Sequence, residues 1–161
     1  METQFIMYRE EDFEECIRIY IDAFTTPPLN YDFVTKEKAW RYIRDITRTP
    51  GFLGFTYWMD GKMAAMCLGT LDSYFGGSMF EVAEFAVDPI HQRSGIGSTV
   101  MNLLETKLAG YNVEAISLHT SRNLPAYGFY LKNGYEELTE NVTLAKLLVD
   151  DDTPDSESTP E

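Results

Sequence analysis

Two glutamates in one apolar run are the residues of this sequence best suited to acid–base chemistry. Glu81 and Glu84 lie within residues 79–87, M-F-E-V-A-E-F-A-V, a run with the composition of a β-strand. Burial among apolar side chains raises the pKa of a carboxyl, which suits a general base that works near neutral pH. Residues three apart face opposite sides of a regular strand, so both carboxylates share a face only if this strand carries a bulge.

The segment that follows this strand has the composition of an anion-binding turn. Residues 87–97 read V-D-P-I-H-Q-R-S-G-I-G, and residues 96–108 have the periodicity of an amphipathic helix. Free N–H groups and the positive end of the dipole at a helix N-terminus favour a phosphate. Gly95 and Gly97 let the backbone approach such a ligand closely. The simpler alternative is an ordinary strand–helix connection.

Two other nucleotide-binding motifs do not fit this segment. The dinucleotide fingerprint needs a third glycine where Val100 stands, and a P-loop needs a lysine directly after Gly97, where the sequence has Ser98.

Composition indicates one globular domain, residues 1–148, followed by an acidic tail, residues 149–161. The chain has 161 residues, 44% of them hydrophobic, and a net charge of −13. Six of the 26 acidic side chains lie in the last twelve residues, which we expect to be disordered; the rest of the chain has a net charge of −7. This charge argues against a nucleic-acid partner and suits a cationic amine, although many soluble proteins are acidic.

The sequence further predicts a cytoplasmic protein without a membrane partner or a metal. No run is apolar over the length of a membrane span, and no secretory signal is visible. Cys16 and Cys67 lie in apolar segments without metal-type spacing, so we expect buried thiols rather than a disulfide.

The remaining pattern supplies the elements that would position the glutamates and the loop. Asp60-Gly61 predicts a tight hairpin and Gly76-Gly77 a second turn. Thr35 and Asn123 are expected helix N-caps. Predicted strands cover residues 4–8, 52–59, 62–74, 79–87, 113–118, 135–138 and 142–148, and predicted helices cover 13–24, 35–49, 96–108 and 126–132.

Two motifs and this order of elements resemble the GNAT N-acetyltransferases. The family's Q/R-x-x-G-x-G/A motif matches Gln92-Arg93-Ser94-Gly95-Ile96-Gly97. Its N-x-x-A-x-x-x-Y-x-x-x-G-F/Y motif matches at Asn123, Ala126, Tyr130, Gly134 and Tyr135. The resemblance covers residues 3–148 and implies an α/β (α+β) fold, with a mixed, mostly antiparallel central sheet flanked by helices.

The resemblance implies that acetyl-CoA is the cosubstrate and that the loop amides hold its pyrophosphate. Tyr130 would protonate the departing thiolate, unless it is simply a core aromatic residue. Glu81 is the first candidate for the base and Glu84 the second, with an ordered water as the alternative. The expected cofactor-binding residues are Phe85, Ala86, Val87, Gln92, Arg93, Ser94, Gly95, Ile96, Gly97, Ser98, Asn123 and Tyr130.

The acceptor implied by the resemblance is a primary amine attacked directly in a ternary complex. The subpattern is similar to aminoglycoside 6'-N-acetyltransferases, so a small cationic amine, aminoglycoside-like or polyamine-like, is the first expectation. The expected substrate-binding residues are Tyr31, Trp58, Glu81 and His119. The alternatives are a protein or peptide amine, or a non-catalytic acyl-CoA-binding module. An exposed last strand could support a homodimer.

Overall fold

The computed structural model describes residues 1–74 and 77–149. The chain divides into two compact units, residues 1–119 and 120–161, and each is considered by itself. The predicted turn at Gly76 and the acidic tail from residue 150 onward lie outside the described residues.

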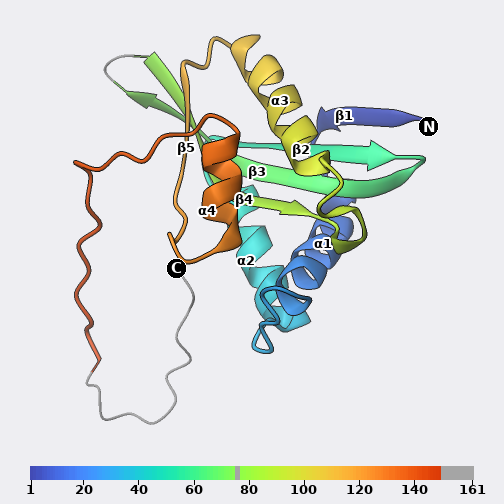
Figure 1. Cartoon of the computed structure of the whole chain (residues 1–161), viewed down its shortest axis with the longest axis horizontal. Helices are drawn as coiled ribbons and strands as arrows, with labels where there is room; N and C mark the ends of the chain where they lie inside the picture. Colours follow the sequence, from blue (N-terminus) through green and yellow to red (C-terminus); the bar gives the residue numbers. More distant parts are fainter. Residues whose placement is uncertain (75–76, 150–161) are drawn as a thin grey trace. The chain divides into compact units, whose positions relative to one another are not determined.

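The first unit is built on a five-stranded sheet with the order β1-β2-β3-β4-β5 (Figure 1). The strands are β1 (Thr3–Met7), β2 (Phe52–Met59), β3 (Lys62–Tyr74), β4 (Gly77–Val87) and β5 (Ala115–Leu118). All neighbours pair antiparallel except β4 and β5, which pair parallel. This arrangement confirms the predicted mixed, mostly antiparallel sheet. The predicted hairpin is also present, because Asp60 and Gly61 have φ values of 50° and 78° between β2 and β3.

Helices cover both faces of this sheet (Figure 1). They are α1 (Phe13–Thr25), α2 (Lys36–Arg48) and α3 (Ile96–Ala109), with short 3-10 turns η1 (Glu10–Asp12) and η2 (Pro89–His91). Thr35 caps α2 as predicted, because its hydroxyl accepts a hydrogen bond from the Lys38 amide.

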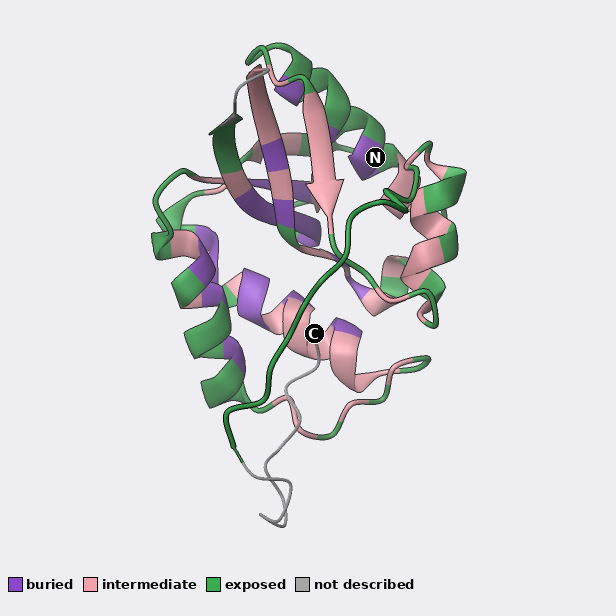
Figure 2. Ribbon diagram, turned by 90° about the vertical axis from the view of Figure 1, so that its left-hand side faces the viewer, coloured by how far each residue is buried: buried purple, intermediate pink, exposed green. Residues whose placement is uncertain are grey.

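The core lies between the sheet and the inward faces of these helices, as the buried positions in Figure 2 show. Ile17 of α1 and Ile43 of α2 belong to one buried cluster with Leu68 of β3. Val100 of α3 packs with Tyr57 and other residues of a second cluster. Both cysteines are buried free thiols, as predicted. Within the described residues, none of the helices is both long and apolar enough to cross a membrane.

The second unit contains α4 (Pro125–Lys132). The predicted cap at Asn123 is wrong by one residue, because Leu124 occupies the N-cap position and makes no side-chain cap. Pro125 accounts for this start, since proline fits the first helical turn and disfavours helical geometry in the residue before it. The helix ends at Asn133-Gly134 as predicted, with Gly134 at φ 89°.

The two strands predicted over residues 135–138 and 142–148 are not formed in the described part of the chain. Alternating apolar residues favour an extended backbone, but a strand also needs a neighbour to satisfy its N–H and C=O groups. The aliphatic side chains of these segments, including Leu144 and Leu148, are instead exposed. The expected last strand is therefore absent as a strand, and dimerisation stays a prediction.

Candidate active site

A bulge in β4 brings the two glutamates to one face of the sheet. Glu84 pairs with Leu68 of β3, and Glu81 pairs with Thr70. Three steps along β4 therefore correspond to only two steps along β3, and Ala83 is the extra residue. Since Leu68 and Thr70 share a face, Glu81 and Glu84 share it too. This is the bulge that the two carboxylates need in order to share a face of the sheet.

Glu84 is half-buried beside α2 on this face. The Tyr42 hydroxyl of α2 donates a hydrogen bond to Glu84 Oε2 at 3.0 Å. Burial raises the pKa of Glu84 to about 8, and the hydrogen bond from Tyr42 acts in the opposite direction. This carboxyl therefore titrates near neutral pH, which suits a group that takes up a proton from a substrate.

Glu81 lies in a more open setting. Its side chain is 43% exposed, and its Oε1 is 3.5 Å from Nδ1 of His119, which follows β5. The parallel pairing of Glu81 with Ser117 brings His119 to this position, two residues further along. The structure thus brings together Glu81 and His119, two of the predicted acceptor-binding residues.

Tyr31 joins a row of aromatic rings that ends beside Glu84. In the loop between α1 and α2, the Tyr31 ring is 6.0 Å from that of Phe24. The Tyr20 ring is 4.7 Å from Phe24 and 5.2 Å from Tyr42. The sequence prediction did not identify Tyr42 or Tyr20 as site residues, because only the packing of α1 and α2 against β4 brings them to Glu84.

Trp58, which the sequence also predicted to bind the acceptor, lies away from Glu81 and Glu84. It lies four positions along β2 from Gly54, the residue paired with Leu68, which is about 13 Å at the usual strand rise. Its indole N–H donates to the Thr56 hydroxyl, and the Arg9 guanidinium lies 5.8 Å from its ring. These contacts give Trp58 a role in packing near β1.

The turn between β4 and α3 has the geometry expected of an anion site. Gly95 is the N-cap of α3 with a left-handed φ of 84°, and Arg93 also has a positive φ of 62°. The Thr99 amide donates to the Gly95 carbonyl and closes the first turn. The amides of residues 96–98 precede that bond and have no partner within the helix. A Cβ at Gly95 would meet nothing within 4 Å, so glycine serves the backbone conformation there.

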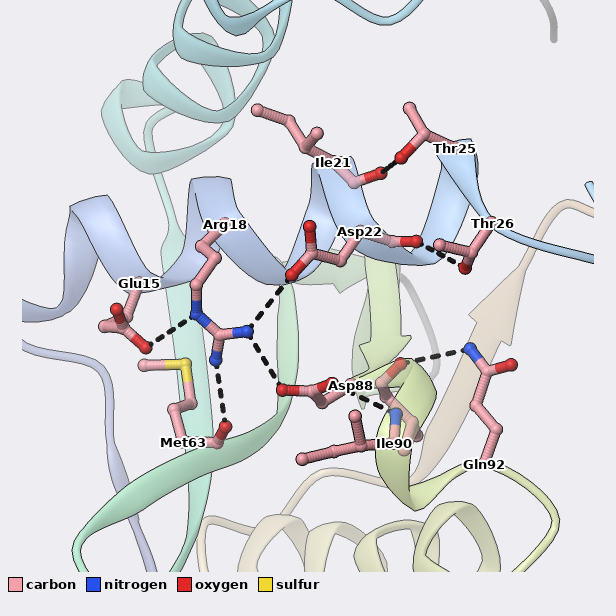
Figure 3. A network of polar contacts seen from close by, with 11 residues as sticks. Glu15, Arg18, Ile21, Asp22, Thr25, Thr26, Met63, Asp88, Ile90 and Gln92 are labelled. Carbon is pink, nitrogen blue, oxygen red and sulfur yellow. Dashed lines mark hydrogen bonds and ion pairs between the residues drawn. The ribbon is translucent and has the colours of Figure 1, made fainter. Parts of the chain in front are cut away.

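The end of β4 and the start of this turn are held by a polar network (Figure 3). Arg18 of α1 donates to Asp88 Oδ2 at 2.9 Å and to the Met63 carbonyl at 3.3 Å. The Asp88 side chain accepts a hydrogen bond from the Ile90 amide and so caps the N-terminus of η2. The Gln92 side chain donates to the carbonyl of Val87 at 3.1 Å, so this motif residue orders the turn. The sequence prediction missed Arg18 and Asp88, because these two partners lie 70 residues apart in the chain.

The other predicted cofactor residues of the first unit lie at the C-terminal end of β4 and in the exposed turn. Ala86 belongs to the cluster under α1 and α2, whereas Phe85 and Val87 pack against the cluster that includes Val100 of α3. Ser94 is exposed and donates from its hydroxyl to the His91 carbonyl. Among the described residues, no group of three or more His, Cys, Asp or Glu side chains could hold a metal ion.

Asn123 and Tyr130 belong to the second unit. Asn123 is exposed and lies two residues before α4, and Tyr130 lies on that helix with its ring 5.5 Å from the Tyr135 ring. Tyr127 donates to Glu137 at 2.9 Å, and Arg122 pairs with the same carboxylate. These two partners lower the pKa of Glu137, with the hydrogen bond from Arg122 as the larger cause.

Comparison with solved structures supports the fold. A possible acetyltransferase from Clostridium difficile has a TM-score of 0.76 at 13% identity, covering 92% of this chain and 100% of that chain. A soil-metagenome aminoglycoside acetyltransferase in complex with sisomicin gives 0.66 at 15% identity, covering 92% and 97%. An aminoglycoside 6'-N-acetyltransferase from Acinetobacter haemolyticus gives 0.66 at 12% identity, covering 91% and 99%.

Sequence comparison adds the family. No curated protein matches this sequence. The model of the Acetyltransferase (GNAT) family matches residues 13–135, a range that includes β4, the turn before α3 and α4. The family model thus covers more than half of the chain, and this chain belongs to the GNAT acetyltransferase family.

Proposed function

We propose that this protein transfers the acetyl group of acetyl-CoA to a primary amine of a small cationic molecule, by direct attack in a ternary complex. Residues 1–148 would act as one functional domain. One observation carries the proposal: β4 holds the half-buried carboxyl of Glu84, bonded to Tyr42, and ends three residues later in a turn that leads to the N-terminus of α3. The proposed base and the proposed phosphate site would thus lie close together, one near the end of β4 and the other in the turn that follows it.

The turn fits the pyrophosphate of acetyl-CoA. The amides of residues 96–98 would hold its oxygens at the start of α3, with Arg93 and Ser94 exposed beside them. Acetyl-CoA supplies an acetyl group that is already activated as a thioester. The chain therefore needs to position two substrates and move protons, and it needs no covalent nucleophile of its own.

Glu84 is the proposed base. As a carboxylate it accepts one proton from the acceptor's ammonium group, leaving a neutral amine and a neutral carboxyl. Glu81, which the sequence ranked first, is more exposed and is proposed to bind positive charge on the acceptor together with Tyr31 and His119. The backbone N–H of Phe85 or Val87 would polarise the acetyl carbonyl. Tyr130 stays the proposed acid, on the strength of its motif.

The choice of a small cationic acceptor has two supports. The net charge of −13 attracts cations, and carboxylates with electron-rich rings recognise ammonium groups. Several proteins of similar structure are aminoglycoside acetyltransferases. The cytoplasm is the proposed location, since both buried cysteines are free thiols.

The test is acetyl-CoA turnover with a panel of aminoglycosides, polyamines and amino acids, followed by release of free thiol. We expect release that depends on the acceptor, lost in Glu84→Gln and kept in Glu105→Gln, an exposed glutamate of α3. Suppose acetyl-CoA raises the melting temperature, which shows binding, but no acceptor in the panel causes release of the coenzyme A thiol. That result would contradict the enzyme and favour a binding module.

A further inference from the structure

Tyr42 of α2 touches the proposed base and the bulge at once. Its hydroxyl lies 3.0 Å from Glu84 Oε2 and 3.3 Å from the carbonyl oxygen of Ala83. Ala83 is the extra residue of the bulge, and such a residue has no cross-strand partner of its own. One phenol therefore has two acceptors within reach, and one of them belongs to a group that titrates.

The ring that carries this hydroxyl is held in place by α1. The Tyr20 ring packs on the Tyr42 ring with a centroid distance of 5.2 Å and an interplanar angle of 36°. Tyr42 is 39% exposed, so this ring contact and the two hydrogen bonds of its hydroxyl are what hold it in place. A hydroxyl held at a defined point is what a positioning role requires.

We propose that Tyr42 is a positioning residue that holds the Glu84 carboxyl in one place whether or not the carboxyl carries a proton. This inference rests on the proposed function, in which Glu84 takes a proton from the acceptor's ammonium group. It adds a residue to the site that neither motif contains.

The two hydrogen-bond arrangements follow from the donors available in each state. When Glu84 is charged, the Tyr42 O–H donates to Oε2. When Glu84 has taken the proton, its own O–H donates to Tyr42 Oη, and the phenolic hydrogen turns to the Ala83 carbonyl. One proton passes from nitrogen to carboxylate oxygen, and the phenol keeps its own proton throughout.

Among the groups near Glu84, the Tyr42 hydroxyl is the one that lowers the pKa of this carboxyl. Tyr42 from α2, Tyr20 from α1 and Cys67 from β3 interact with its charge, and burial raises the pKa of all three. They are therefore neutral near pH 7. Glu81 lies on the same face of β4, and its partner His119 is beside it. Burial and the Tyr42 hydrogen bond are the two influences on the pKa of Glu84, in that order.

The test is Tyr42→Phe, which keeps the ring and removes the hydroxyl. We expect the pKa of Glu84, followed by carbon-13 NMR of its carboxyl and assigned with Glu84→Gln, to rise above about 8. The inflection in the pH dependence of kcat/KM should move to higher pH by the same amount as the pKa of Glu84. A rise of one unit lowers the charged fraction, and hence kcat/KM at pH 7, about tenfold. Tyr111→Phe, which removes an exposed hydroxyl after α3, is the matched control and should shift neither.

A second measurement needs no variant. In the unaltered protein, the Tyr42 ring resonances should change with pH at the same midpoint as the Glu84 carboxyl. A Glu84 pKa and pH profile unchanged by Tyr42→Phe, or ring resonances that ignore the Glu84 titration, would overturn the proposal. Absence of thiol release in the unaltered protein would instead count against the proposed function, and both NMR titrations would still decide the role of Tyr42.

Discussion

Arg18 and Asp88 form an ion pair of 2.9 Å that joins the middle of α1 to the first residue after β4. Asp88 is almost fully buried, and its other carboxylate oxygen accepts from the Ile90 amide. The Arg18 guanidinium also reaches Glu15 and Asp22 of its own helix. This pair couples α1, which packs on the face of the sheet that carries Glu84, to the turn proposed for the pyrophosphate.

Arg18→Ala should weaken both the fold and acetyl-CoA binding. The change leaves the buried Asp88 carboxylate without its charged partner, which typically costs about 1–3 kcal/mol. We expect a lower urea midpoint and a larger Kd for acetyl-CoA by calorimetry, because Asp88 starts the turn. The control is Arg41→Ala, which breaks an exposed pair with Glu37 and should cost no more than about 0.5 kcal/mol. Equal effects of the two changes would contradict the coupling.

The activity should rise with pH through the pKa of the proposed base. Glu84 acts only when charged, and burial raises its pKa to about 8, so kcat/KM for the amine should climb across that value. In Glu84→Gln this inflection should vanish along with most of the rate. The measurement is the pH–rate profile with saturating acetyl-CoA. A profile with the same inflection in Glu84→Gln would assign the base to another group.

The same pKa shift predicts how stability depends on pH. The ordinary pKa of Glu84 is 4.5 and burial raises it to about 8, so between these values the folded protein holds a proton that the unfolded chain releases. The free energy of unfolding contributed by this group therefore falls as pH rises, by up to about 1.4 kcal/mol per unit, and levels off above pH 8.

The Glu84→Gln variant has no carboxyl at this position to titrate, so its stability at each pH is the reference for the unaltered protein. The unaltered protein should lose stability relative to Glu84→Gln as pH rises from 5 to 8, and the two should converge below pH 4.5. Urea unfolding across this range provides the data. Parallel curves would mean that Glu84 titrates in the folded protein as it does in the unfolded chain.

Local patterns in the sequence predicted most of the fold, and contacts between distant residues account for what they missed. The bounds of β2 and β3 and the hairpin at Asp60-Gly61 follow from periodicity and turn chemistry. The prediction of the last two strands was wrong. A sequence pattern indicates that a segment suits an extended backbone, but it does not show whether a neighbouring strand is there to pair with it. Tyr42 could not be found beside Glu84, because 42 residues separate them and helix packing alone joins them.

The bulge did leave a signal. Gly69 interrupts an otherwise regular strand, and an added Cβ would lie 2.2 Å from the Glu81 carbonyl oxygen. A glycine inside a strand is typical of a bulge or of a close backbone approach. The sequence does not show that the extra residue lies in β4, opposite this glycine. Only the pairing of β3 with β4 in the structure shows it.

Two glycines, one inside α4 and one just after it, should respond in opposite directions to substitution by alanine. Gly128 lies within the helix, and a Cβ there would meet nothing within 4 Å, so Gly128→Ala should stabilise the second unit by about 0.5–1 kcal/mol. Gly134 follows the helix at a φ of 89°, so Gly134→Ala should destabilise it by about 1–2 kcal/mol. Hydrogen exchange of the α4 amides measures both effects. Slower exchange in Gly134→Ala, or faster exchange in Gly128→Ala, would contradict the helix bounds on which the Tyr130 motif depends.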